Sequence, residues 1–325
     1  MTPARARFEG QGVLARALIR LCLFEVAIYA VPGWWLVGIR GWTPAAALAG
    51  AAVIAVCWRV AMTLASYAVA WRYRDRAPPE FQRSSFALLG YLLMEAAATI
   101  AVYGVLQPLE RLVIGNARPT SLSRARLPVL LLPGYVCNRA LWWVLARALR
   151  GGSEDCWAVT LEPVYGRIDD LVVPLAAALD ELLSETGHPQ AVIVAHSMGG
   201  LVARAYLRDY GARKVARLIT LGSPHHGSMH ARLGAGFNAR EMEPGSAWLH
   251  ALAAAEGGGF PVPFTSIFSY HDNFVAPQTS GRHPAARNIA LAGVGHLSLV
   301  FSPRVRRLVA AELDAASTVH REQAV

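Results

Sequence analysis

One stretch of the sequence holds residues whose types and spacing suit covalent chemistry, AVIVAHSMGGLVARAYL at positions 191–207. Its first five residues are apolar and predict a buried strand, and the residues after Ser197 predict a helix. A serine at such a turn exposes its hydroxyl above a sheet, and the turn needs small residues two positions before and after it. Ala195 and Gly199 occupy those positions. The pattern predicts that Ser197 is a nucleophile; the alternative is a glycine-rich helix start with an incidental serine.

The turn lies within an alternation of strands and helices. Apolar segments typical of strands occur at 128–132, 157–161, 191–195, 217–221, 264–268 and 288–291. Helical patterns occur at 138–150, 170–186, 197–210 and 303–315. This alternation predicts an α/β fold, with a mostly parallel sheet of about six strands and helices on both faces.

Five short motifs follow one another in this region: LLPGY (131–135), AHSMGG (195–200), LGSPHHGS (221–228), SYHDNFVAP (269–277) and GVGH (293–296). On these motifs, residues 127 to about 316 resemble an α/β-hydrolase of the small bacterial lipase and esterase type. The resemblance implies the α/β-hydrolase fold and a catalytic triad in the chain order Ser, Asp, His. It does not extend to the first 126 residues.

The resemblance places the acid after one late strand and the base after the last strand, which implies Asp272 and His296. A serine needs an imidazole to take its proton, and a carboxylate fixes the tautomer of that imidazole. Asp169 and Asp170 compete as the acid, but they precede a helix that they could cap. Four other histidines do not follow a final strand: His225, His226, His230 and His271.

An acyl-transfer site also needs backbone donors for the oxyanion. The N–H of Met198, directly after the serine, is one candidate. The resemblance assigns the second to the N–H of Tyr135; many relatives carry His-Gly before it, where this chain has Pro133-Gly134. Residues 229–262 contain an apolar WLHAL segment and form either a small lid or an inert connection.

Cofactor and metal motifs are missing from the sequence. We find no P-loop and no dinucleotide fingerprint, and the four cysteines lack metal-ligand spacing. We therefore expect no cofactor and no metal.

The amino-terminal third differs in composition from the rest. Residues 1–126 contain 14 Arg and 6 acidic residues, so they carry +8 of the total charge of +9. This excess lies beside apolar stretches, which indicates membrane flanks rather than a nucleic-acid surface. Runs of about 20 apolar residues are long enough to span a bilayer, and three occur, at 21–39, 45–71 and 86–106. The alternatives are a signal peptide for the first run and buried core helices for all three.

We therefore divide the chain into three parts. Residues 1–114 are predicted to be a membrane anchor with about three transmembrane helices, 115–126 a polar linker, and 127–325 the catalytic domain. Charged residues inside the runs are costly in hydrocarbon unless they are paired. We expect pairing between helices, rather than an ion pathway, for Glu25, Arg59 and Glu95.

Arginines flank the runs unevenly. Four precede the first run and four lie at 72–83, whereas Arg40 alone lies between the first two runs. An excess of arginine in short loops marks the cytoplasmic side. Three crossings would then place the catalytic domain on the periplasmic face of a bacterial inner membrane. Four later arginines oppose this orientation and would hold the third run as a re-entrant or surface helix: Arg111, Arg118, Arg124 and Arg126.

Together these observations predict a membrane-anchored serine hydrolase that cleaves carboxylic, lipid-like acyl esters through an acyl-enzyme. Its expected partners are the lipid bilayer and a small-molecule or lipid ester, with no nucleic acid; the sequence predicts no oligomeric state. A hydrolase-fold acyltransferase or thioesterase is one alternative, distinguished by an alcohol or thiol acceptor that competes with water. A non-catalytic membrane interaction protein is the other, and the complete Ser, Asp and His set argues against it.

Overall fold

The computed structural model describes residues 12–114, 126–151, 156–257 and 259–323. From residue 126 onward it is built on a six-stranded sheet in the order β2-β1-β3-β4-β5-β6, and all neighbouring strands are parallel. The strands are β1 (Val129–Leu132), β2 (Cys156–Ala158), β3 (Ala191–His196), β4 (Val215–Leu221), β5 (Phe264–Ser269) and β6 (Arg287–Leu291). Each predicted strand overlaps an observed one, so the predicted sheet is confirmed.

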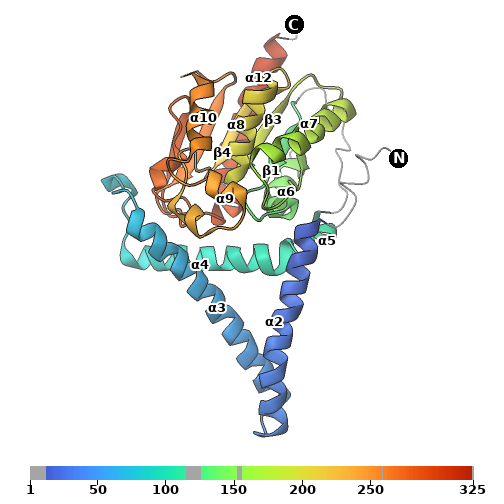
Figure 1. Ribbon diagram of the computed structural model, residues 1–325, viewed down its shortest axis with the longest axis vertical. Coiled ribbons are helices and arrows are strands. Elements are labelled where there is room, and N and C mark those ends of the chain that lie inside the picture. The colour runs from blue at the N-terminus through green and yellow to red at the C-terminus, as the bar shows by residue number, and fades with distance from the viewer. Residues whose placement is uncertain (1–11, 115–125, 152–155, 258, 324–325) are drawn as a thin grey trace.

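Helices connect the strands and flank the sheet (Figure 1). The longer ones are α6 (Trp143–Gly151), α7 (Val172–Thr186), α8 (Met198–Tyr210), α10 (Ala247–Glu256) and α12 (Pro303–Gln323). Shorter ones are η3 (Arg139–Trp142), η4 (Asp169–Leu171), η5 (Met229–Leu233), α9 (Phe237–Glu241), η6 (Gln278–Gly281) and α11 (Ser298–Phe301).

The sheet is buried on both faces, as the continuous apolar run of β1 shows. Val129 and Leu131 belong to one hydrophobic cluster, with residues of α6 and α12, whereas Leu130 and Leu132 belong to another, with residues of α7 and α8. All four side chains are 0% exposed. Because alternate residues of a strand face opposite sides of the sheet, helices must cover both faces.

The amino-terminal helices lie below the sheet domain and pack against it, since Val102, Leu106 and Ile114 belong to the same hydrophobic cluster as Val129 and Leu131. They are α2 (Val13–Gly38), α3 (Pro44–Tyr73), η1 (Pro79–Phe81), α4 (Ser85–Thr99), the π-helical continuation η2 (Ile100–Leu106) and α5 (Glu110–Ile114). In Figure 1, α2 and α3 meet at the end far from the sheet and diverge toward it, and α4 runs across the base of the sheet domain. The predicted linker lies outside the described residues except for Arg126.

All three apolar runs are helical, as predicted. Among the residues that the structure describes, two helices are long and apolar enough to cross a membrane, judged by length and composition alone: Pro44–Tyr73 and Phe86–Leu106. The number of crossings therefore stays a prediction.

Two of the three charges inside these runs pair as expected. Arg59 donates two hydrogen bonds of 2.6 Å to the Glu25 carboxylate and so joins α3 to α2. Glu95 does not pair with another amino-terminal helix. It is fully buried and accepts hydrogen bonds from the backbone N–H groups of Leu297 and Ser298 at 2.8 and 2.9 Å. The prediction for Glu95 was wrong because three donors of the sheet domain, including the Ser298 hydroxyl, satisfy its carboxylate.

Candidate active site

Ser197 lies at the apex of the turn between β3 and α8. Its backbone has φ 54° and ψ −128°, and positive φ is costly for a residue with a side chain. Such strain persists only where the surroundings enforce it, and it is concentrated at functional sites. The Ser197 N–H donates to the Leu221 carbonyl at 2.9 Å, which attaches the turn to the end of β4.

Glycines on both sides of the serine permit this tight turn. A Cβ on Gly199 would lie 2.6 Å from the Pro133 carbonyl oxygen, and one on Gly134 would lie 2.7 Å from the Ser197 Cβ. Ala195 is completely buried. The predicted requirement for small residues around Ser197 therefore has a direct steric cause.

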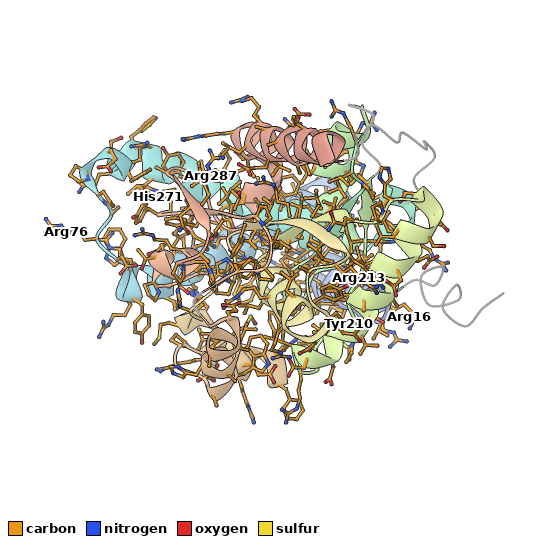
Figure 2. All side chains as sticks on the ribbon, turned by 90° about the horizontal axis from the view of Figure 1, so that it is seen from above. Arg16, Arg76, Tyr210, Arg213, His271 and Arg287 are labelled. Atoms are coloured by element: carbon orange, nitrogen blue, oxygen red, sulfur yellow. The ribbon has the colours of Figure 1, made fainter. Side chains whose placement is uncertain are left out.

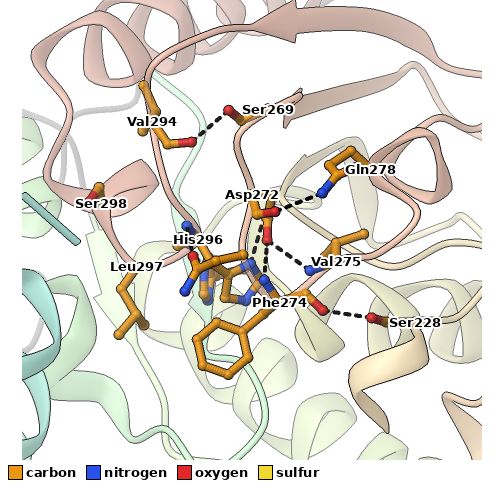
Figure 3. A network of polar contacts seen from close by, with 12 residues as sticks. Ser228, Ser269, Asp272, Phe274, Val275, Gln278, Val294, His296, Leu297 and Ser298 are labelled. Atoms are coloured by element: carbon orange, nitrogen blue, oxygen red, sulfur yellow. Dashed lines mark hydrogen bonds and ion pairs between the residues drawn. The ribbon is translucent and has the colours of Figure 1, made fainter. Parts of the chain in front are cut away.

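Asp272 and His296 form a buried hydrogen-bonded pair (Figure 3). The Nδ1 of His296 lies 2.8 Å from Oδ2 of Asp272. The other carboxylate oxygen accepts the N–H groups of Phe274 and Val275, both at 2.8 Å. These donors hold the carboxylate in place with Oδ2 facing the imidazole, so His296 carries its proton on Nδ1 and leaves Nε2 as an acceptor.

Electrostatics favour a basic imidazole at this position. Burial lowers the pKa of His296, but the negative charge and hydrogen bond of Asp272, together with the charge of Glu95, outweigh it, and the pKa is raised. His196 has the opposite character: burial, reinforced by the nearby His296, lowers its pKa to about 3. Of these two adjacent rings, His296 is therefore the one suited to accept a proton.

The structure brings His296 beside the serine turn. The Nε2 of His196 lies 3.1 Å from the His296 carbonyl oxygen, and the two ring centroids are 4.6 Å apart. Ser197 and His296 line the same cavity, which has a volume of about 930 Å³. Ser197, His296 and Asp272, three residues predicted to act together, are thus gathered at one end of the sheet.

The two predicted oxyanion donors also lie at the serine. Met198 begins α8, so its N–H is one of those that have no carbonyl a turn earlier in the helix. Tyr135 follows Gly134, which touches Ser197, and Val136 has a positive φ of 51°. The Tyr135 hydroxyl exchanges hydrogen bonds with the backbone of Ala235 at 2.7 and 2.8 Å. The strained loop at 133–137 and its attachment to residue 235 were not predicted.

The competing acids have other roles. Asp169 accepts hydrogen bonds from Arg208 and from the Trp248 indole. Asp170 accepts the Arg167 N–H. Neither side chain caps α7, whose first turn has no side-chain cap, so the predicted capping role is wrong, although both carboxylates are engaged away from His296.

The competing histidines are engaged elsewhere too. The Nε2 of His225 lies 3.0 Å from the Thr220 hydroxyl, and the Nδ1 of His271 accepts the Gly293 N–H. His230 lines the cavity, with its Nε2 3.0 Å from the Ser66 carbonyl of α3.

Several supporting residues were missed from the sequence. The Asn273 side chain accepts the His296 N–H at 3.0 Å and donates to the Ser66 hydroxyl at 2.8 Å. Glu95 binds the two N–H groups that follow His296. The only indication of Asn273 in the sequence was its position next to Asp272. Nothing in the sequence connected α3 or α4 to the site.

The segment 229–262 contributes a wall of the cavity. His230, Leu233 and Met242 line it, while α10 packs against α8. The segment is therefore more than an inert connection, and its role as a lid stays a prediction.

Within the described ranges, no group of three or more His, Cys, Asp or Glu side chains could hold a metal ion.

Comparisons with known proteins agree with this geometry. A family model described as alpha/beta hydrolase fold matches residues 167–254, which include α7 and α8. The mature form of the Bacillus licheniformis lipase BlEst2 is similar at 18% identity and a TM-score of 0.50, over 56% of this chain and 89% of that protein. Aspergillus fumigatus lipase B is similar at 17% identity and a TM-score of 0.52, over 57% of this chain and 52% of that protein. At such identities the likeness concerns the fold.

This chain thus spans about half the length of the fungal lipase. The parallel sheet, the strained Ser197 turn and these similarities show that the region from residue 126 onward has the α/β-hydrolase fold.

Proposed function

We propose that this chain is a membrane-anchored serine hydrolase that cleaves carboxylic esters through an acyl-enzyme. Ser197 is the nucleophile, His296 the general base and acid, and Asp272 the carboxylate that orients the imidazole. The observation that carries the proposal is the buried Asp272–His296 pair, whose imidazole lines one cavity with a serine in strained backbone geometry.

The reaction follows from the proton positions. His296 Nε2 takes the Ser197 proton as Oγ bonds to the ester carbonyl carbon, and the N–H groups of Met198 and Tyr135 stabilise the oxyanion. His296 then protonates the leaving alcohol oxygen as its C–O bond breaks, which leaves the acyl group on Ser197. Water, deprotonated by His296, attacks the acyl carbon; the bond from that carbon to Ser197 Oγ then breaks, His296 returns the proton to Oγ, and the carboxylic acid is released.

We also propose a membrane arrangement in which α2 and α3 cross as a hairpin, whereas α4 lies at the surface although it has the length and composition of a span. The helix α2 is not one of the two candidate spans, and its crossing is inferred from its exposed apolar side chains and its ion pair with α3. Large apolar side chains of α2 and α3 are exposed along the hairpin. Trp42 precedes α3 and Trp71 lies in its last turn, and the helix from residue 44 to residue 71 is about 40 Å long at 1.5 Å per residue, which matches a bilayer with its interfaces. In α4, Ala96 and Ala98 pack inward, whereas Phe86 and Leu89 are exposed, as in a helix that lies on a membrane.

This hairpin reverses the expected side of the membrane. Two crossings return the chain to the side on which it began, so Arg16, Arg20 and the arginines of 72–83 share the side of the hydrolase domain. Arg40 is at the far tip. Seen from above, Arg16 and Arg76 lie at opposite edges of the molecule (Figure 2). Arginine excess marks the cytoplasmic side, so we propose a cytoplasmic hydrolase domain; Arg5 and Arg7 lie outside the described residues.

Ester hydrolysis by the full-length chain tests the proposed activity. We expect Ser197→Ala to lower turnover of p-nitrophenyl butyrate by about 10⁴-fold or more, because no other group replaces the nucleophile. Ser184→Ala, an exposed serine on α7, is the matched control and should keep full activity. Near-full turnover by Ser197→Ala would remove the assignment.

A further inference from the structure

We propose that the space between α2 and α3 is the acyl-chain site, and that a lipid ester enters it sideways from the bilayer. This inference rests on the hydrolase function and membrane hairpin proposed above. It assigns substrate binding to helices that would otherwise serve only as an anchor.

The first support is the continuity of the cavity. Ser197 and His296 line the same space as Phe24 of α2 and Trp58 and Met62 of α3. The reacting serine therefore faces a space that extends out of the hydrolase domain and between the two helices. An ester bound at Ser197 would place its acyl chain along the hairpin.

The second support is the chemistry of the hairpin wall. Phe24, Trp58 and Met62 are 63, 58 and 51% exposed, although large apolar side chains are costly to expose to water. In a bilayer their neighbours are acyl chains. Because α2 and α3 diverge toward the hydrolase domain (Figure 1), the gap between them is widest near the reacting end. A lipid can enter through this gap without leaving the hydrocarbon.

The third support is the depth of the cavity. Its lining on α3 runs from Val69 to Ile54, fifteen residues or about 22 Å along the helix. One leaflet is roughly half of a hydrocarbon core of about 30 Å. The part of the cavity between α2 and α3, here called the slot, is therefore long enough for the acyl chain of a membrane lipid, which is more than a short soluble ester would need.

The Glu25–Arg59 ion pair keeps the slot in shape. Both residues line the cavity, and their paired hydrogen bonds fasten α2 to α3 at this depth. Tyr29 donates a third hydrogen bond to Glu25 at 2.8 Å. The width of the slot is thus set by fixed polar contacts and does not depend on loosely packed side chains.

Tryptophan substitutions along the slot test this inference. Met62→Trp should reduce kcat/KM for p-nitrophenyl palmitate in phosphatidylcholine vesicles by about tenfold or more, because each excluded methylene loses its apolar contacts. Hydrolysis of p-nitrophenyl butyrate should stay within about twofold, since a four-carbon chain ends near Ser197. The deeper Ile54→Trp should reduce hydrolysis of the palmitoyl ester but not of an octanoyl ester.

Neighbouring residues outside the cavity supply matched controls. Leu64→Trp and Val53→Trp alter residues that are 49 and 61% exposed on α3, away from the slot, and should leave both esters unaffected. Fluorophosphonate labelling of every variant checks that Ser197 remains intact. Equal effects of Met62→Trp and Ile54→Trp on both chain lengths, or effects no larger than those of the controls, would overturn the acyl-chain site. If the unmodified chain shows no Ser197-dependent ester hydrolysis, the proposed hydrolase function is wrong instead.

Discussion

Opposing influences act on the pKa of His296, and their balance predicts how activity depends on pH. Burial lowers its pKa, while the charge and hydrogen bond of Asp272 and the charge of Glu95 raise it to a value above the ordinary one. In the proposed mechanism the neutral imidazole is the base, so activity should fall as pH decreases through this raised pKa. The acid limb of kcat/KM should therefore lie above about 6.5, the usual histidine value.

Replacement of the carboxylate should change this profile in a defined direction. Asp272→Asn removes the main influence that raises the pKa of His296 but keeps the burial that lowers it. We expect kcat to fall by roughly 10³- to 10⁴-fold and the acid limb to move to lower pH. The measurement is kcat/KM against pH. A mild effect of Asp272→Asn together with a severe effect of Asp169→Asn would mean that the acid was chosen wrongly.

Glu95 is a positioning residue for His296. It accepts the N–H groups of the two residues that follow the imidazole, and its charge contributes to the raised pKa of His296. Glu95→Gln should move the acid limb to lower pH by less than Asp272→Asn does, with KM unchanged. The exposed Glu80→Gln is the control. A loss of activity at an unchanged pH profile would show that Glu95 only stabilises the fold.

At the scale of elements, the Glu25–Arg59 pair joins the two hairpin helices. Arg59→Met leaves the Glu25 carboxylate without its partner in an apolar setting, which costs more than removal of both charges. We expect the single variant to lose fluorophosphonate labelling at a lower temperature than the unmodified chain. The double variant Glu25→Gln/Arg59→Met should recover most of the difference. No recovery in the double variant would contradict this account of the pair.

The sheet and the serine turn could be predicted because their sequence patterns are local. An apolar strand followed by small residues around a serine has few other conformations, and the structure shows the steric contacts that require Gly199. The role of α4 could not be predicted in this way. Its apolar composition suits a membrane span and a helix on the base of a domain equally well, and the backbone N–H partners of Glu95 have no sequence signature.

The same limit applies to the cavity wall. From the sequence, Met62 and Trp58 cannot be distinguished from the membrane-facing residues of an apolar helix. Only the three-dimensional arrangement places them in one cavity with Ser197. The contact between Asn273 and Ser66 likewise joins residues far apart in sequence. Contacts of this kind depend on how the hairpin meets the hydrolase domain, which no local pattern encodes.

For the whole molecule, the hairpin arrangement predicts the side of the membrane on which the enzyme works. A fluorescent protein fused after Val325 should mature, and alkaline phosphatase at the same site should be silent, because two crossings return the chain to the arginine-rich side. A phosphatase inserted in the tip at 39–43 should be active and serves as the control. Active phosphatase after Val325 would support three crossings and a periplasmic domain.

The most direct test of the central claim is the site of covalent labelling by a fluorophosphonate. Trypsin releases residues 168–204 as one peptide, which contains both Ser184 and Ser197. Fragmentation of the labelled peptide should place the phosphonate on Ser197, and the Asp272→Asn and His296→Ala variants should label far more slowly. A phosphonate on Ser184 or on another peptide, or hydrolysis by an enzyme whose Ser197 is never labelled, would contradict the assignment of Ser197 as the nucleophile.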